Sequence, residues 1–150
     1  MNLHQLNMNN FMKQEFFDLI VETNGQKLYE FTDKIITWVK KNNFSNGILN
    51  LNIQHTSASL IVQENADPDV QTDLINYFDK LAPMDNALYV HTTEGKDDMP
   101  AHIKSSLTNN QLTLSIKKGE LVLGTWQGLY LFEHRLSPQK RKVVLHFLGD

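Results

Sequence analysis

The stretch from His91 to Leu107 holds two histidines, three acidic residues, a glycine and a proline. No packing requirement explains this mixture, and so polar a segment belongs at the surface, because it cannot satisfy its own backbone groups inside a core. The imidazoles of His91 and His102 bracket the carboxylates, which is typical of a metal site or of acid/base chemistry. The stretch is therefore the first candidate functional site.

Histidine is the metal ligand to expect, because the chain has no cysteine. Disulfides, zinc–thiolate sites and cysteine nucleophiles are thereby excluded. Imidazole suits zinc and similar divalent metals, with carboxylates completing the site. The candidate ligands stand at the ends of expected strands or beside loops: His55, His91, His102 and His134. The carboxylates that could orient these imidazoles or act as general bases are Glu64, Asp98 and Glu133.

Three consecutive residues combine a carboxylate, an imidazole that can take up or release a proton near neutral pH, and a guanidinium that can bind an anion: Glu133, His134 and Arg135. On a strand, Glu133 and Arg135 share one face and His134 the other, so all three converge only if the strand ends there. A helix opening at Met99–Ala101, with Asp98 as its cap, would present free amides to an anion. Lys104 and Arg135 could add positive charge for a diphosphate group.

Several other chemistries lack their motifs. The chain contains neither of the two phosphate-binding glycine loops, G-x-x-x-x-G-K-[ST] and G-x-G-x-x-G, and it lacks the G-x-S-x-G elbow of serine hydrolases. A serine hydrolase built from Ser57 or Ser59 with a histidine remains open, since the sequence gives only the residue types. The formal charge of −3 and the pI near 6.0 argue against nucleic acid as a partner. Without an apolar run of roughly 20 residues or a signal-peptide core, we expect a cytoplasmic protein with no membrane partner.

The elements around these residues are expected to form one domain over residues 12–150, after a flexible Asn-rich leader at residues 1–11. Bulky and β-branched residues followed by a turn signal predict a strand over Gln14–Glu22. A short strand at Lys27–Phe31 would pair with it as a hairpin. The hydroxyl of Thr32 is the expected cap of the first helix, which ends at Asn42.

The strand at Ile48–Gln54 alternates cleanly, and its apolar phase slips at His55–Ser57, which indicates a bulge or bend. Asp67 and Pro68 are typical of a helix start, so a second helix is expected to run to Leu81, with Tyr77 and Phe78 in the core. A short helix follows at Met99–Leu107.

The rest of the chain reads as β-structure, with strands at residues 112–117, 120–123, 129–134 and 142–148. Apolar residues on both parities of Val143–Leu148 predict a central strand covered on both faces. The pattern predicts an α+β domain with a large antiparallel or mixed sheet, two main helices and one short helix.

Three blocks carry a resemblance to a known family: H-T-S-A-S-L…E-N-A-D-P-D-V at His55–Val70, D-D-M-P-A-H-I-K-S-S-L at Asp97–Leu107, and L-G-T-W-Q-G-L-Y-L-F-E-H-R at Leu123–Arg135. Their order and separation resemble the YjbQ-like family, small proteins called secondary thiamine-phosphate synthases. The resemblance covers residues 12–150.

The resemblance implies a β/β/α-type sandwich that assembles as a homotrimer and has a metal pocket. It makes His55, His91 and His102 the leading metal ligands, with His134 in reserve. The residues it places around them are Glu64, Asp67, Asp98, Trp126 and Gln127. Of these, we assign Asp67, Trp126 and Gln127 to substrate binding together with Ser57 and Lys104, and Glu64 and Asp98 to catalysis together with Glu133, His134 and Arg135.

The activity assigned to that family joins a pyrimidine diphosphate to a thiazole phosphate and releases pyrophosphate, as a weak side activity. A histidine cluster favours zinc, whereas a diphosphate substrate favours magnesium. Two hypotheses follow. The chain is a metal-dependent enzyme acting on a small phosphorylated or heterocyclic substrate, or it is a non-catalytic trimeric module that binds a small ligand or a partner, with a structural metal.

Overall fold

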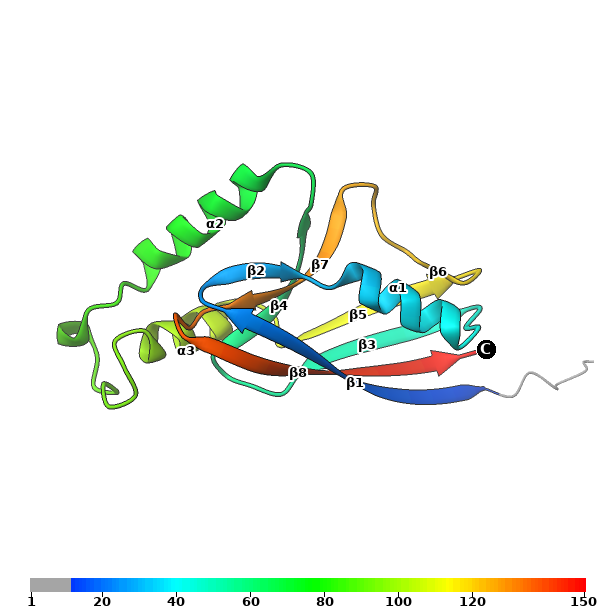
Figure 1. The fold of residues 1–150 in the computed structure, drawn as a ribbon, viewed down its shortest axis with the longest axis horizontal. Helices are drawn as coiled ribbons and strands as arrows, with labels where there is room; N and C mark the ends of the chain where they lie inside the picture. The colour runs from blue at the N-terminus through cyan, green and yellow to red at the C-terminus, as the bar shows by residue number, and fades with distance from the viewer. Residues whose placement is uncertain (1–11) are drawn as a thin grey trace, which may run out of the picture.

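The strands form two antiparallel sheets that lie face to face (Figure 1). The computed structural model describes residues 12–150, and the predicted leader at residues 1–11 lies outside them. The larger sheet has, in order, β1 (Lys13–Asn24), β8 (Pro138–Gly149), β3 (Gly47–Ile53), β5 (Gln111–Lys117) and β6 (Glu120–Leu121). The smaller sheet has the order β2 (Lys27–Glu30), β7 (Gln127–Glu133) and β4 (Ala58–Glu64). The predicted α+β class is confirmed.

The core lies between the two sheets and follows the predicted alternation. In β3, Leu49, Leu51 and Ile53 are buried while the residues between them point outward. They pack in one cluster with Leu129 and Leu131 of β7. Burial of these side chains is the main favourable contribution to the fold, since a fully buried Leu or Ile stabilises by about 1.5–3 kcal/mol.

Helices complete the layers. α1 (Thr32–Lys41) buries Ile35, Trp38 and Val39 in the same core cluster. α2 (Pro68–Leu81) lies over the other face of the smaller sheet, where the Phe78 ring meets Phe132 with centroids 5.6 Å apart. α3 (Asp98–Leu107) packs beside β4, after a single 3-10 turn, η1 (Asn86–Leu88). None of the helices described in residues 12–150 is long and apolar enough to cross a membrane.

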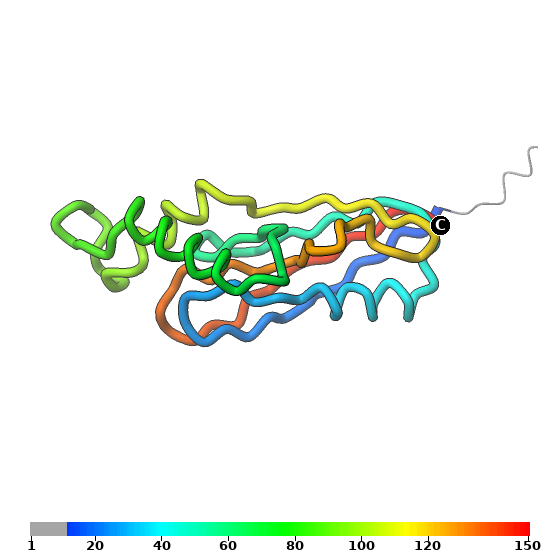
Figure 2. Tube along the Cα trace, turned by 90° about the horizontal axis from the view of Figure 1, so that it is seen from above, coloured from blue at the N-terminus to red at the C-terminus, as the bar shows by residue number. Residues whose placement is uncertain are grey.

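The predicted core position of Tyr77 in α2 is wrong. Its side chain is 63% exposed, and no residue of α2 falls in the buried class among the described residues. The reason is that only one side of the helix touches the sheet, through Ile75 and Phe78. Figures 1 and 2 show α2 and the segment that follows it extending beyond one end of the sheets.

Two local predictions near the first helix are also wrong. β2 pairs with β7 instead of forming a hairpin with β1, because the turn at Gly25 carries the chain from one sheet to the other. Thr32 does not cap α1. Its hydroxyl donates to Glu30 Oε1 at 2.9 Å and accepts from the Leu129 amide at 2.9 Å, so it ties the helix start to the smaller sheet.

The strand that is covered on both faces is β7, and the prediction of this property for residues 143–148 is wrong. β8 is central in its sheet, but Leu148 is 40% exposed and only alternate residues are buried. In β7, every residue from Gly128 to Glu133 is buried, because the larger sheet covers one face and α2 the other. This strand ends at Glu133, at the end of the sandwich where the candidate site lies, and His134 follows it directly.

Candidate functional site

Two chain crossings and the start of α3 meet at one end of the sandwich. The chain passes from the larger to the smaller sheet through residues 54–57, and returns through residues 134–137. The change in apolar alternation at His55–Ser57 predicted a bulge or bend. In the structure the chain bends there and crosses from one sheet to the other. The crossings place His55, Ser57, His134 and Arg135 at the same end, because β4 and β7 pair there with Ala58 opposite Glu133.

A compact cluster unites His91, Asp98 and His102. One ligand atom from each lies within 4.8 Å of the others. His91 Nε2 is 2.8 Å from Asp98 Oδ2, and His102 Nε2 is 3.2 Å from the same oxygen. Asp98 and His102 are one helical turn apart on α3, so the helix itself sets their spacing. Two imidazoles and a carboxylate are a donor set that binds zinc or another divalent transition metal.

Asp98 is not the cap of α3, contrary to prediction. It is the first residue of the helix, and its carboxylate turns into the cluster while Arg135 donates to Oδ1. Burial would raise the pKa of the Asp98 carboxyl, but the hydrogen bond from His91 and the charge of Arg135 outweigh it and lower that pKa. Asp98 thus stays ionised at neutral pH.

Arg135 joins α3 to the second crossing. Its Nε donates to Asp97 Oδ2 at 3.0 Å, and its Nη2 donates to the Glu94 carbonyl at 2.9 Å. Asp97 also accepts from the Leu136 amide at 2.9 Å. Gly95 makes this loop feasible, because its φ of +109° is one that side-chain-bearing residues rarely adopt. The guanidinium therefore positions the Asp98 carboxylate through Oδ1, the oxygen that the two histidines do not contact.

His102 is oriented so that Nε2 can act as a ligand. Its Nδ1 lies 3.0 Å from the backbone carbonyl of Thr56. A carbonyl can only accept, so Nδ1 carries a proton. Nε2 is the nitrogen that faces Asp98, and a metal bound between them would take the place of the hydrogen bond that joins Nε2 to Asp98 Oδ2. This is the arrangement that metal-bound histidines use, with the far nitrogen donating to a fixed acceptor.

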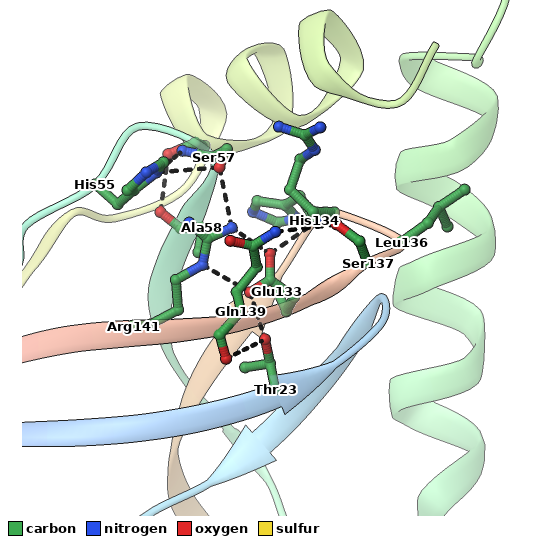
Figure 3. Close-up of polar contacts among 12 residues, drawn as sticks. Thr23, His55, Ser57, Ala58, Glu133, His134, Leu136, Ser137, Gln139 and Arg141 are labelled. Carbon is green, nitrogen blue, oxygen red and sulfur yellow. Dashed lines mark hydrogen bonds and ion pairs between the residues drawn. The ribbon is translucent and has the colours of Figure 1, made fainter. Parts of the chain in front are cut away.

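A second network runs through the interior from Thr23 to His55 (Figure 3). Arg141 and Glu133, 2% and 0% exposed, form two hydrogen bonds of 2.7 and 2.6 Å. Thr23 Oγ1 donates to Glu133 Oε2 at 2.8 Å, and Arg141 Nη2 donates to Ser57 Oγ at 3.0 Å. Ser57 Oγ is in turn 3.0 Å from His55 Nδ1. Burial and the charge of Arg141 lower the pKa of His55.

His134 lies inside the fold, apart from the cluster. It is fully buried, and its Nε2 is 2.9 Å from Ser59 Oγ, while its Nδ1 has no partner in the described residues. Burial and the charge of Lys104 lower its pKa to about 3, so it is neutral at physiological pH. The ammonium of Lys104 is likewise buried, 2.5 Å from Asp79 Oδ1.

The structure does not bring all predicted site residues together within one chain. Glu64 pairs with Gln127 at the opposite end of β4 and β7 from Ala58 and Glu133. Six residue steps along a strand span roughly 20 Å. The residues at that far end are Glu64, Asp67, Trp126 and Gln127. Asp67 has a structural role there, accepting from the Asp69 amide at 2.9 Å as the predicted cap of α2.

His55 also stands outside the compact cluster, although it lines one depression with His102. The residues that sequence reasoning missed are Thr23, Asp79, Asp97 and Arg141. The sequence did contain an indication for Arg141. It lies two and four residues before Val143 and Leu145 on β8, so its side chain points to the same buried face and its charge needs a buried partner. The sequence contains no comparable indication for Asp79 and Thr23.

Comparison with known proteins points to one family. The family model described as UPF0047 protein YjbQ-like matches residues 18–150. A UPF0047 protein of Synechocystis sp. is 48% identical over 132 residues, covering 88% of this chain and 90% of the relative. The UPF0047 protein YjbQ of Salmonella typhimurium is 49% identical over 104 residues, covering 69% of this chain and 75% of the relative.

Solved structures agree with this match. A conserved hypothetical protein from Thermus thermophilus has a TM-score of 0.77 at 36% identity, covering 85% of this chain and 97% of that chain. A protein of unknown function from Sulfolobus solfataricus has a TM-score of 0.84 at 23% identity, covering 93% of this chain and 100% of that chain. The second likeness supports the fold alone.

Proposed function

This chain belongs to the UPF0047 family of YjbQ-like proteins, and we propose that it is a divalent-metal-dependent enzyme acting on a small phosphorylated or heterocyclic substrate. The observation that carries the proposal is the convergence of His91, Asp98 and His102 within 4.8 Å. Two further features support it. Asp98 is held ionised by Arg135, and His102 is held with its Nε2 toward the cluster by the contact of its Nδ1 with the Thr56 carbonyl.

Zinc is the metal we propose, because two imidazoles and a carboxylate suit it better than the oxygen-only sites that magnesium prefers. The bound ion would supply Lewis acidity toward a phosphoryl or carbonyl oxygen. Magnesium would then enter with a diphosphate substrate and need not occupy the histidine cluster. Thiamine-phosphate synthesis is proposed as a secondary activity of this site.

Two residues assigned to catalysis from the sequence have other contacts that suggest a supporting role. Glu133 is fully buried, with both carboxylate oxygens bonded to Arg141. His134 is buried and neutral beside Ser59. In this proposal they hold the crossings in place, while Asp98 and Arg135 act at the ligand.

The test is metal content and turnover in untagged protein. We expect one tightly bound zinc per chain, lost in His91→Ala and His102→Ala and retained in His146→Gln, because His146 stacks on Phe16 on the outer face of the larger sheet. Turnover of phosphorylated heterocycles should vanish on chelation and return with zinc. A parent protein that binds no divalent metal would refute the proposal.

A non-catalytic homotrimeric module with a structural metal is the second candidate. It is favoured by apolar side chains exposed along α2 and after it, with Tyr77 63%, Leu81 51% and Val90 102% exposed. Patches of this kind mark interaction sites. Light scattering should then show trimers that Leu81→Ser weakens, and chelation should dissociate them or lower the melting temperature. Metal-dependent turnover by dissociated chains would contradict this second candidate.

A further inference from the structure

His55 and His102 have opposite hydrogen-bonding patterns although they line the same depression, which has a volume of about 290 Å³. The Nδ1 of His102 faces a carbonyl, the oxygen of Thr56, and therefore donates. The Nδ1 of His55 faces the backbone amide of Ser57 at 3.1 Å. An amide N–H can only donate, so this nitrogen of His55 must accept.

The hydroxyl of Ser57 reinforces this tautomer. Arg141 Nη2 donates to Ser57 Oγ at 3.0 Å, and a guanidinium has no lone pair with which to accept. The oxygen of Ser57 is thus the acceptor toward Arg141, which leaves its hydrogen for His55 Nδ1 at 3.0 Å. Ser57 and Arg141 are 1% and 2% exposed, and Glu133 fixes the guanidinium from the other side.

The consequence concerns the outer nitrogen of His55. With Nδ1 accepting from two donors, the neutral ring carries its proton on Nε2, at the edge that faces away from the network. A nitrogen that bears a proton has no lone pair for a metal. His55 therefore presents a hydrogen-bond donor in the depression that it shares with His102, whose own Nε2 lies 3.2 Å from Asp98 Oδ2.

The neighbouring charges favour an anionic acceptor once a metal binds. Two guanidiniums, Arg135 and Arg141, are paired with three carboxylates, Asp97, Asp98 and Glu133. Glu94 Oε1 lies 4.0 Å from His91 Nε2, so the site has two more negative than positive charges. A divalent cation at His91, Asp98 and His102 would offset this excess and supply a positive centre. Phosphoryl and carboxylate oxygens accept strong hydrogen bonds and are attracted by such a field.

We propose that His55 donates a hydrogen bond through Nε2–H to an oxyanion, of the phosphate type, held at the His91–Asp98–His102 metal centre, and that His55 is not itself a metal ligand. The inference rests on the proposed function, because it presumes that the centre binds a metal. It assigns Ser57 and Arg141 as the residues that position His55.

The experiment uses zinc-loaded protein and inorganic phosphate, with titration calorimetry as the binding measurement. His55→Ala should keep its zinc and bind phosphate at least tenfold more weakly, which corresponds to about 1.4 kcal/mol. His55→Gln should restore phosphate affinity to within about threefold, because its side-chain amide can donate from the same place. His102→Gln should lose the zinc. Unfolding curves of all variants check that the fold is kept.

The outcomes separate the two claims. No zinc in the parent protein would overturn the proposed function and, with it, this inference. Zinc lost in His55→Ala, phosphate affinity unchanged in that variant, or no phosphate binding to the zinc-loaded parent would overturn the inference alone. Nitrogen-15 spectra give a readout independent of binding: Nδ1 of His55 should be unprotonated and its Nε2 protonated, whereas Nδ1 of metal-free His102 should be protonated. A protonated Nδ1 in neutral His55 would overturn the assignment.

Discussion

Arg141 and Glu133 form a fully buried, two-pronged ion pair, with Nε 2.7 Å from Oε2 and Nη2 2.6 Å from Oε1. The pair joins β8 of the larger sheet to β7, the central strand of the smaller sheet. Thr23 and the Arg135 amide occupy the remaining positions on the carboxylate. Because both carboxylate oxygens and the two facing guanidinium nitrogens are hydrogen-bonded, the charges can stay inside the core.

Removing one charge of this pair should destabilise the fold strongly. Glu133→Gln leaves the Arg141 guanidinium buried without a counter-charge, and we expect a loss of about 3–5 kcal/mol in the free energy of unfolding. Glu133→Leu combined with Arg141→Met should recover most of the loss, because an apolar pair of similar volume carries no desolvation cost. Urea unfolding measures both. A loss below about 1 kcal/mol in Glu133→Gln would contradict the interpretation.

Arg135 should control metal affinity without touching the metal. It holds Asp98 Oδ1 and Asp97 Oδ2, so Arg135→Lys releases the carboxylate from its fixed orientation. We expect zinc affinity to fall by about 10–100-fold, the usual effect of losing a residue that orients a ligand. The matched control is Lys140→Ala, because Lys140 pairs with Glu22 at the surface, where both are over 70% exposed. Equal zinc affinity in parent protein and Arg135→Lys would refute the orienting role.

Asp79 should anchor α2 to the body of the protein. Its Oδ1 accepts from Lys104 Nζ of α3 at 2.5 Å and from Gln26 Nε2 at 2.8 Å. Asp79→Ala leaves a buried ammonium unpaired, and because Asp79 is itself 43% exposed we expect a moderate loss of about 2 kcal/mol. Amide exchange should accelerate along α2. Adding Lys104→Met should reverse most of both effects, and a double variant no better than Asp79→Ala would contradict this account.

The sequence predicted the parts of the fold that depend on local chemistry. Alternation identified β3, and Asp67 with Pro68 identified the start of α2, because a cap and a strand parity are properties of neighbouring residues. The choice of partner strand is not local. β2 follows β1 directly yet pairs with β7, since the turn at Gly25 crosses between sheets. Local pattern could not distinguish a hairpin from a crossing.

The candidate site shows the same division. Residue type and loop position predicted His91 and His102 as metal ligands and Asp98 as a catalytic residue, and the fold brings these three together. They could not separate His55 from that group, because the difference lies in which backbone group each Nδ1 faces. Nor could they show that Lys104 is buried: its partner Asp79 is 25 residues away on a different helix.

His134 should make stability fall as the pH is lowered. Burial and the charge of Lys104 lower its pKa to about 3, whereas the unfolded chain has the ordinary value of 6.5. Between these pH values the unfolded state binds a proton that the folded state does not, so stability is full above pH 6.5 and falls by about 1.4 kcal/mol per pH unit below it. His134→Gln lacks this titration while keeping a group that can bond Ser59. In urea unfolding, the advantage of the parent protein over His134→Gln should shrink by about 2–3 kcal/mol between about pH 7 and about pH 4.5. Other acids titrate alike in both proteins. A difference in unfolding free energy that stays constant across this range would therefore mean that His134 takes up its proton in the folded state as readily as in the unfolded state.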